Sequence, residues 1–330
     1  MGERTGSTKR KLIDLFKETE DYLSGQWLAD TLSVSRTAVW KNIKELEKEG
    51  FLFEVVKKKG YKLVGTSPGI SPASIQSTLN TKEIGRTFYH FTEVKSTQEK
   101  IHTMAKEGYP NGTVALADEQ TAGKGRMKRD WNSLKGKGIW MSLLLRPSIP
   151  PQKAPQLTLV AATSIVNVLQ ASGIEATVKW PNDLMIGDRK VCGILTEMRA
   201  EQDSIDYLAL GIGLNVNQSL EDMPVELERK ATSLYMETGE ERVISEIVTE
   251  LLNRLEYELN RYFELGFSPF QEEWGKIGYK VGQWVSVSTW GEPWRAKIDR
   301  MEADGALMVL DSSGREHQLY SAEILWNENY

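Results

Sequence analysis

One short basic segment combines the residue types that hold an anion. Residues 123–137 read GKGRMKRDWNSLKGK, with six lysines and arginines, glycines at 123, 125 and 136, and one tryptophan. Glycine lets backbone N–H groups approach an anion closely, and the neighbouring cations supply charge. The segment lacks the third glycine of the dinucleotide fingerprint and the GK[ST] of a P-loop. Taken alone, it leaves three alternatives open: a nucleic-acid site, a phosphate site, or a solvated loop.

The stretch at residues 95–100 places polar groups at a predicted helix start. Its sequence is KSTQEK, with Ser96 three residues before Glu99, which is the spacing of a capping box. Capping is a sufficient structural reason for this serine. The same helix N-terminus, with Thr97 and Gln98 beside it, is also suited to donate hydrogen bonds to a polar ligand.

Two later stretches add further polar groups. Residues 179–195 read KWPNDLMIGDRKVCGIL, where we expect a proline turn and a hairpin that carry Lys179, Asn182, Asp183 and Lys190. GIGLNVN at 211–217 ends a predicted strand with Asn215 and Asn217. Asp183 is either a general base or a turn-capping residue, and Trp131 is either a lid over a ligand or a core residue.

Composition limits the class of protein. The 330 residues are 40% hydrophobic and 26% charged, which predicts a globular chain of two to three domains. No apolar run is long enough to cross a bilayer and the N-terminus has no apolar signal region, so we expect a cytoplasmic protein without a membrane partner. Cys192 is the only cysteine and the three histidines are far apart, so no disulfide and no protein-only metal cage is expected.

The first 65 residues predict a winged helix. They carry 13 lysines and arginines against 10 acidic residues, whereas the remainder carries 28 against 36. Three helices are expected, the last one capped by Ser35, with Val39, Ile43 and Leu46 as its apolar stripe and Gly50 as its stop. A hairpin with the turn KKKG follows.

The exposed side of this predicted third helix and the hairpin tip predict DNA binding. A helix in the major groove would present Ser35, Arg36, Thr37, Trp40, Lys41 and Lys44 to the bases, and the tip would bring Lys57, Lys58 and Lys59 to phosphate. The alternative is that Lys41 and Glu45 form a solvated i, i+4 pair and that the lysine run is only a charged turn.

The rest of the chain predicts two more domains. Residues 65–74, GTSPGISPAS, have the composition of a linker. Strand-like and helical runs alternate up to about residue 275, which predicts a mixed α/β (α+β) domain, and short strands separated by turn signals then predict a small β barrel. The expected domains are therefore 1–65, 66–275 and 276–330.

Taken in order, these motifs resemble one family over almost the whole chain: the bifunctional biotin protein ligases that also repress the biotin operon. The match comprises the winged helix, STQ where the family usually has STN, GKGRMKRDW where it has GRGRRGRxW, KWPND, the lysine of RKVCGIL, and GIGLNVN. Lipoate ligases share the fold class but lack this set. The resemblance implies a central ligase domain related to class II synthetases and an SH3-like C-terminal barrel.

The resemblance implies the following roles for residues. Biotin would lie beside Ser96, Thr97, Gln98, Gln120, Lys124, Gly125, Arg126, Lys190 and Gly193. The nucleotide would lie beside Arg126, Lys128, Arg129, Trp131, Asn182, Lys190 and Asn215. Arg126, Lys190 and Asp183 would be catalytic. Lys124 replaces an arginine of the family pattern, which keeps the charge and loses the bidentate fork, and Gln98 is a longer amide than the usual Asn.

The resemblance also implies cofactors and partners. Mg²⁺ and ATP would convert biotin to biotinoyl-5′-AMP, which is both the intermediate and the corepressor. The acceptor would be a lysine of the biotin carboxyl carrier protein of acetyl-CoA carboxylase. Adenylate would order the basic loop and favour a homodimer that binds operator DNA. The alternatives are a biotin-sensing repressor without catalysis and a lipoate-type acyl ligase.

Overall fold

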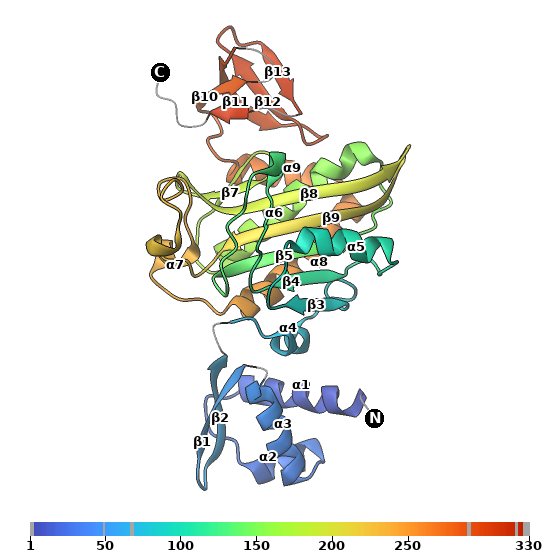
Figure 1. The fold of residues 1–330 in the computed structure, drawn as a ribbon, viewed down its shortest axis with the longest axis vertical. Helices are drawn as coiled ribbons and strands as arrows, with labels where there is room; N and C mark the ends of the chain where they lie inside the picture. Colours follow the sequence, from blue (N-terminus) through green and yellow to red (C-terminus); the bar gives the residue numbers. More distant parts are fainter. Residues whose placement is uncertain (1–2, 49, 67–68, 289–291, 321–322, 326–330) are drawn as a thin grey trace.

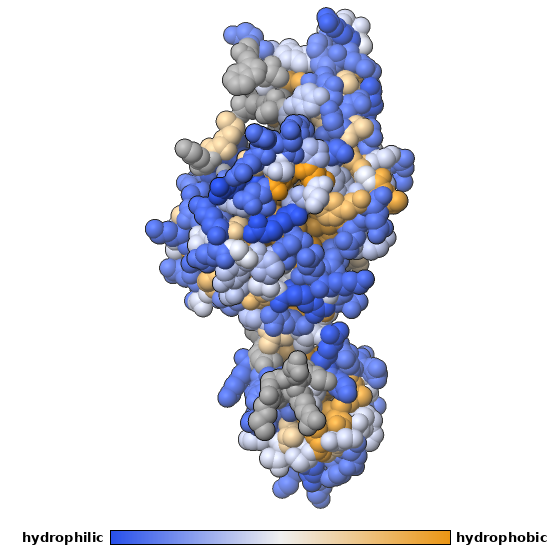
Figure 2. All heavy atoms as spheres, turned by 90° about the vertical axis from the view of Figure 1, so that its right-hand side faces the viewer, coloured by the Kyte–Doolittle hydropathy of each residue, from blue (hydrophilic) through white to orange (hydrophobic). Residues whose placement is uncertain are grey.

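The computed structural model describes residues 3–48, 50–66, 69–288, 292–320 and 323–325. Figure 1 shows an N-terminal head, a central body built on a large sheet, and a small C-terminal sheet, arranged along the long axis. Figure 2 shows a face that is mostly hydrophilic, with hydrophobic patches on the head and on the central body. No helix in these described ranges is long and apolar enough to span a bilayer.

The head is a helix-turn-helix unit with a β hairpin, as the sequence predicts. It comprises α1 (Glu3–Lys17), α2 (Gly25–Leu32), α3 (Arg36–Lys48), β1 (Phe51–Val56) and β2 (Gly60–Thr66). Val39, Ile43 and Leu46 of α3 are fully buried in one core with residues of α1 and α2. Ser35 caps α3, since its hydroxyl accepts the N–H of Ala38 at 3.1 Å.

The hairpin is pinned to the helices at its base. Leu23 and Tyr61 exchange backbone hydrogen bonds of 2.8 and 2.9 Å. A Cβ at Gly60 would lie 2.1 Å from the carbonyl oxygen of Leu23, and Gly60 has φ of +121°. Glycine is therefore required there, and this close approach fixes the direction in which the turn at residues 57–59 projects.

The central body is built on a seven-stranded mixed sheet in the order β3-β4-β5-β9-β8-β7-β6. The strands are β3 (Phe88–Phe91), β4 (Val114–Ala117), β5 (Gly138–Leu145), β6 (Thr177–Lys179), β7 (Asp183–Ile186), β8 (Arg189–Glu201) and β9 (Ser204–Asn215). Strands β3 and β4 are parallel and the other pairs are antiparallel. These elements confirm the predicted fold class.

Helices cover both faces of this sheet. The body contains α4 (Pro72–Thr78), α5 (Thr97–Lys106), α6 (Ala154–Ala171), α7 (Leu234–Thr238), α8 (Ile244–Leu265) and α9 (Ser268–Ile277), with 3₁₀ turns at Arg126–Lys128, Pro151–Lys153 and Leu220–Asp222. Leu143 joins the large core with α6 and α8, whereas the next residue, Leu144, joins the smaller core with α5. Because side chains alternate along a strand, α5 lies on the opposite face from α6 and α8, and this is the face that carries the cavity described below.

The predicted linker at residues 65–74 is wrong at its end, because α4 begins at Pro72. Side chains of α8 bond to the backbone of residues 71–84. Ser245 accepts the N–H of Ser71 at 2.7 Å, and Asn253 accepts that of Asn80 at 2.8 Å. Glu256 accepts three consecutive N–H groups, from residues 82–84, at 2.6 to 2.9 Å. The segment that leads out of the head is thus fixed to the central body.

The C-terminal sheet is antiparallel, in the order β13-β12-β11-β10-β14. Its strands are β10 (Trp284–Ser288), β11 (Trp294–Met301), β12 (Leu307–Asp311), β13 (Glu316–Leu319) and β14 (Glu323–Leu325). Side chains of the central body bond to its backbone: Trp180 Nε1 donates to Gly305 O at 3.1 Å, and Gln271 Nε2 donates to Met301 O at 2.7 Å.

Candidate active site

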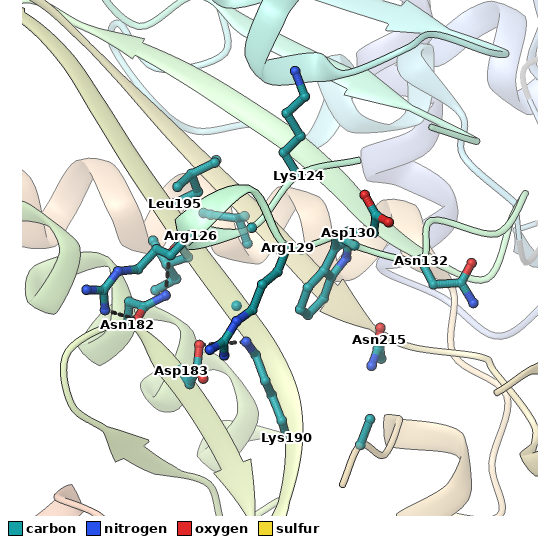
Figure 3. A pocket seen from close by; sticks show the side chains of 18 of the residues that line it. Lys124, Arg126, Arg129, Asp130, Asn132, Asn182, Asp183, Lys190, Leu195 and Asn215 are labelled. Carbon is teal, nitrogen blue, oxygen red and sulfur yellow. Dashed lines mark hydrogen bonds and ion pairs between the residues drawn. The ribbon is translucent and has the colours of Figure 1, made fainter. Parts of the chain in front are cut away.

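A cavity of about 980 Å³ lies between the N-terminus of α5, the basic segment, β5, β8, β9 and the β6–β8 region (Figure 3). Its lining includes all the ligase residues predicted from sequence whose side chains are described: Ser96, Thr97, Gln98, Gln120, Lys124, Gly125, Arg126, Arg129, Trp131, Asn182, Asp183, Lys190, Gly193 and Asn215. The side chain of Lys128 lies outside the described part. Stretches up to about 120 residues apart therefore meet at one place.

One end of the cavity is a network of neutral polar side chains. Gln120 Oε1 accepts the backbone N–H of Thr97 at 2.8 Å, and Gln120 Nε2 donates to the Ser133 hydroxyl at 2.9 Å. The hydroxyls of Thr97 and Ser142 are 2.8 Å apart. Because these groups are held by one another, this end presents donors and acceptors in fixed directions.

Gln98 is bonded to the sheet. Its Nε2 donates to Ala209 O at 3.0 Å and to Leu195 O at 3.4 Å, and its Oε1 accepts the Ser142 hydroxyl at 2.9 Å. A Cβ at Gly211 would lie 2.7 Å from that Oε1, which explains a glycine in the strand. Gln98 thus supports the cavity floor, and its contact with biotin stays a prediction.

The capping box predicted at the start of α5 is wrong. Ser96 occupies the N-cap position but makes no side-chain capping bond, and it is a buried residue of the cavity lining. Glu99 instead accepts a hydrogen bond from Lys124 Nζ at 2.6 Å. This pair is half-exposed, and the hydrogen bond from Lys124 is the main cause that lowers the pKa of Glu99. The cation of Lys124 is directed at α5.

The other cations converge on the opposite side of the cavity. Arg126 Nη1 donates to Asn182 Oδ1 at 2.8 Å, and Lys190 Nζ lies 2.7 Å from Asp183 Oδ1. Figure 3 shows Arg129 directed toward Asp183 and Lys190, whereas Lys124 points away from them. Positive side chains from the basic segment and from β8 therefore surround one region of the cavity.

Trp131 lies on a floor of glycines. Gly193 of β8 and Gly213 of β9 are opposite each other in the sheet. A Cβ at Gly213 would come within 2.5 Å of Trp131 Nε1, and one at Gly193 within 2.9 Å of its Cζ3. Lys190 Nζ stands 5.0 Å from the centre of the indole. The ring thus packs on the cavity's own floor, between the polar end and the cations.

Several lining residues were missing from the sequence-based site. Ser142 lies inside the continuous apolar strand GIWMSLLL, where a single hydroxyl carries no signal of its own. Lys179, which was named from the sequence as a polar group without a role, also lines the cavity, and burial is the main cause that lowers its pKa. Asn215 donates from Nδ2 to Thr232 O at 2.9 Å and accepts from Gln218 Nε2 at 3.0 Å, so its amide is tied to a loop that sequence reasoning passed over.

No group of three or more His, Cys, Asp or Glu residues converges within the described ranges. Cys192 is fully buried and burial raises the pKa of its thiol, so it packs as a small hydrophobic residue.

The predicted DNA-contacting residues lie on the surface of the head. Those exposed are Ser35, Arg36, Thr37, Trp40, Lys41, Lys44, Lys57, Lys58 and Lys59. Trp40 is 52% exposed on α3, unusual for an indole. Glu45 pairs with Lys9 at 3.0 Å, so the alternative pair with Lys41 is not the one formed. Lys44 pairs with Glu47 at 2.6 Å.

The fold and the cavity define a class of protein. Residues 90–215 match the model of the biotin/lipoate A/B protein ligase family, and residues 8–62 match that of an HTH domain. The chain is thus a ligase of the biotin and lipoate type joined to a helix-turn-helix head.

Relatives narrow the class to one family. The chain is 41% identical over 321 residues to the bifunctional ligase/repressor BirA of Bacillus subtilis, covering 96% of this chain and 98% of the relative. It is 29% identical over 216 residues to the biotin--[acetyl-CoA-carboxylase] ligase of Paracoccus denitrificans, covering 63% of this chain and 88% of that one. The chain belongs to the family of bifunctional biotin ligases and biotin operon repressors.

A solved structure agrees with this assignment. The biotin protein ligase from Aquifex aeolicus, in complex with biotin and ATP, is similar with a TM-score of 0.64 at 29% identity, covering 73% of this chain and all of that one.

Proposed function

We propose that this cavity joins biotin to AMP and then passes the biotinoyl group to a lysine of the carrier protein of acetyl-CoA carboxylase. The observation that carries the proposal is that Arg126, Arg129 and Lys190 converge in the same cavity as the polar pair Thr97 and Gln120. Its volume of about 980 Å³ is at the upper end of the usual range for a small-molecule site.

The first step needs charge neutralisation rather than a base. A carboxylic acid with a pKa of about 4.5 is already ionised at neutral pH. One carboxylate oxygen attacks the α-phosphorus of ATP, the bond to the β-phosphate breaks, and pyrophosphate leaves with the electron pair. Negative charge gathers around phosphorus in the transition state, so Arg126 and Lys190, already placed, stabilise it without reorganisation.

The polar end and the floor would orient biotin. Gln120 and the Thr97 hydroxyl supply the amide and hydroxyl groups that match a cyclic urea, which has both N–H donors and a carbonyl acceptor. Trp131, lying between this end and the cations, would cover the mixed anhydride and exclude water from it.

Mg²⁺ that accompanies ATP is usually held by one or two carboxylates together with phosphate oxygens. Asp183 fits this requirement, since it lines the cavity beside the cations, and it would hold the ion. The bound ion would supply further positive charge at the phosphates. Asp183 also stands 2.7 Å from Lys190 and so orients that ammonium.

The second step forms an amide. The uncharged amine of the acceptor lysine attacks the acyl carbon, the bond from that carbon to AMP breaks, and the amine loses a proton. Lys190 and Arg126 would stabilise the departing phosphate, which carries the charge away. In this proposal Asp183 is the base that takes the proton from the attacking amine.

The same adenylate would act as corepressor. The Arg126–Asn182 hydrogen bond links the basic segment to the β6–β7 turn, and the 2.8 Å bond from Gly125 N to Arg129 O closes a turn within it. Bound phosphate would add attractive contacts to the segment. We propose that the ordered segment favours a homodimer, which places two α3 helices on a palindromic operator. A protein that acts on both a chromosome and a carrier enzyme works in the cytoplasm.

Incubation with labelled biotin, Mg-ATP and a carrier domain tests the ligase. Label on a carrier lysine is expected, together with biotin-dependent exchange of pyrophosphate into ATP. Biotin binding without exchange would leave only a sensor, and labelling by lipoate in place of biotin would reveal a lipoate-type ligase. Equal dimerisation with and without biotinoyl-AMP, measured by sedimentation, would rule out the corepressor mechanism.

A further inference from the structure

The segment from Lys230 to Glu237 crosses the sheet edge where β8 begins and β9 ends. Lys190 donates its N–H to Lys230 O at 2.8 Å, and its carbonyl accepts the N–H of Thr232 at 2.9 Å. These two bonds form a parallel bridge between Lys190 and Ala231. The backbone that carries the Lys190 ammonium is thus held by this segment on the β9 side, beyond the end of β9, while β7 pairs with Lys190 on the other side.

Thr232 uses each of its polar groups within this arrangement. Its N–H goes to Lys190, its carbonyl accepts Nδ2 of Asn215 at 2.9 Å, and its hydroxyl donates to Glu237 Oε1 at 2.5 Å. The residue has no exposed surface, whereas its neighbours Lys230 and Ala231 line the cavity. A single buried residue therefore links the strand of Lys190 to the side chain of Asn215.

The carboxylate of Glu237 extends this link to the turn before Lys190. Glu237 Oε1 also accepts from Arg189 Nη2 at 2.7 Å. Hydrogen bonds to an ionised carboxylate are shorter and stronger than those between neutral groups. Arg189 directly precedes Lys190 in the chain, so the hydroxyl of Thr232 and the guanidinium of Arg189 meet at one oxygen and fix the start of β8.

We propose that Thr232 and Glu237 are positioning residues for adenylate formation, which hold Lys190 and Asn215 in the places where they meet the nucleotide and the reacting carboxylate. The inference rests on the proposed role of Lys190. A misplacement of about 1 Å at a reacting group is enough to cost a hundredfold in rate. Because Lys190 meets charge that develops in the transition state, loosening it lowers kcat more than it raises KM.

The test compares Thr232→Val with Thr232→Ser in biotin-dependent pyrophosphate exchange. Valine removes the hydroxyl and keeps a similar shape, whereas serine keeps the hydroxyl. We expect T232V to lower kcat about tenfold with the KM for biotin changed less than about twofold, and T232S to retain most of the activity. Glu237→Gln, which removes the charge that holds Arg189, is expected to lose a similar factor.

Thr113→Val is the matched control. Thr113 is also fully buried, and its hydroxyl donates to Pro110 O at 2.7 Å in a turn remote from these contacts. T113V is expected to keep wild-type kcat, and melting temperatures of both valine variants show whether each remains folded at the assay temperature. Equal losses of kcat in T113V and T232V would overturn the inference.

The double variant of Thr232→Val and Lys190→Ala distinguishes a loss of Lys190 positioning from a general effect on the fold. T232V is expected to add no further loss to the residual rate of K190A; a full tenfold further loss would overturn the inference. If K190A itself keeps wild-type activity, the proposed function of the site fails at that residue. If K190A is inactive while T232V and E237Q match the wild type, only the positioning inference fails.

Discussion

Gly213→Ala perturbs the contact on which the covering role of Trp131 depends. An added Cβ would lie 2.5 Å from Trp131 Nε1 and 2.6 Å from its Cε2, whereas ordinary contacts begin at 3.4 Å. The ring must therefore move by about 1 Å. Gly213 is not among the residues with positive φ, so alanine suits its strand backbone and the cost is steric. Overpacking of this kind costs about 1–3 kcal/mol, and a loss of that size in transition-state binding corresponds to about five- to 150-fold in kcat/KM for adenylate formation.

Biotin-dependent pyrophosphate exchange measures this step directly. Gly275→Ala is the control, since nothing lies within 4 Å of a Cβ added there in α9, and alanine favours a helix. G275A is expected to keep wild-type activity. In a Trp131→Ala background G213A should cost nothing more, because the ring it strikes is gone. Wild-type activity in G213A, or an equal further loss in the W131A background, would refute the reasoning.

Three more predictions concern separate parts of the molecule. Arg126→Ala should lower exchange about a hundredfold or more without lowering the melting temperature; unchanged exchange removes Arg126 from the mechanism. Replacement of the lysines at residues 57–59 by alanine should weaken operator binding and leave pyrophosphate exchange unaltered. The slope of log affinity against log salt concentration should become shallower by about one unit for each phosphate that is no longer neutralised, which titration of labelled operator DNA at several salt concentrations measures. The hydrogen bond from His102 is the main cause that lowers the pKa of Glu197 below its ordinary 4.5. The ionised Glu197 therefore stabilises the folded state above pH 4.5, and this contribution is lost as the pH falls through the lowered pKa. Glu197→Gln should therefore lower the melting temperature at pH 7 and differ less from wild type near pH 4; a constant difference contradicts the assignment.

Local signals were enough for the head, and the family resemblance named many residues that line the cavity. Ser35 caps α3 and the stripe of Val39, Ile43 and Leu46 is buried, because caps and helical periodicity are written in neighbouring residues. The motifs that carry the resemblance include many of the residues that line the cavity, because each motif is a short run that can be recognised in the sequence.

Contacts between distant segments were not predictable in the same way. Glu99 has the spacing of a capping box, but its carboxylate instead accepts a 2.6 Å hydrogen bond from Lys124, which lies 25 residues later in the sequence. Thr232 lies in the polar run KATSLYMETG, which reads as an ordinary loop. Its bonds to Lys190, Asn215 and Glu237, which are distant in the sequence or made by the folded backbone, give it a place at the site. Contacts of this kind depend on which segments the folded chain brings together, and local sequence spacing does not encode them.

A crystal soaked with biotinoyl-5′-AMP is the decisive test of the proposed site. We expect the bicyclic ring at Thr97 and Gln120, the phosphate within hydrogen-bond distance of Arg126 and Lys190, and Trp131 covering the anhydride. An adenylate bound elsewhere, or one in this cavity with Arg126 and Lys190 both turned away from its phosphate, would show that the cations do not serve the reaction.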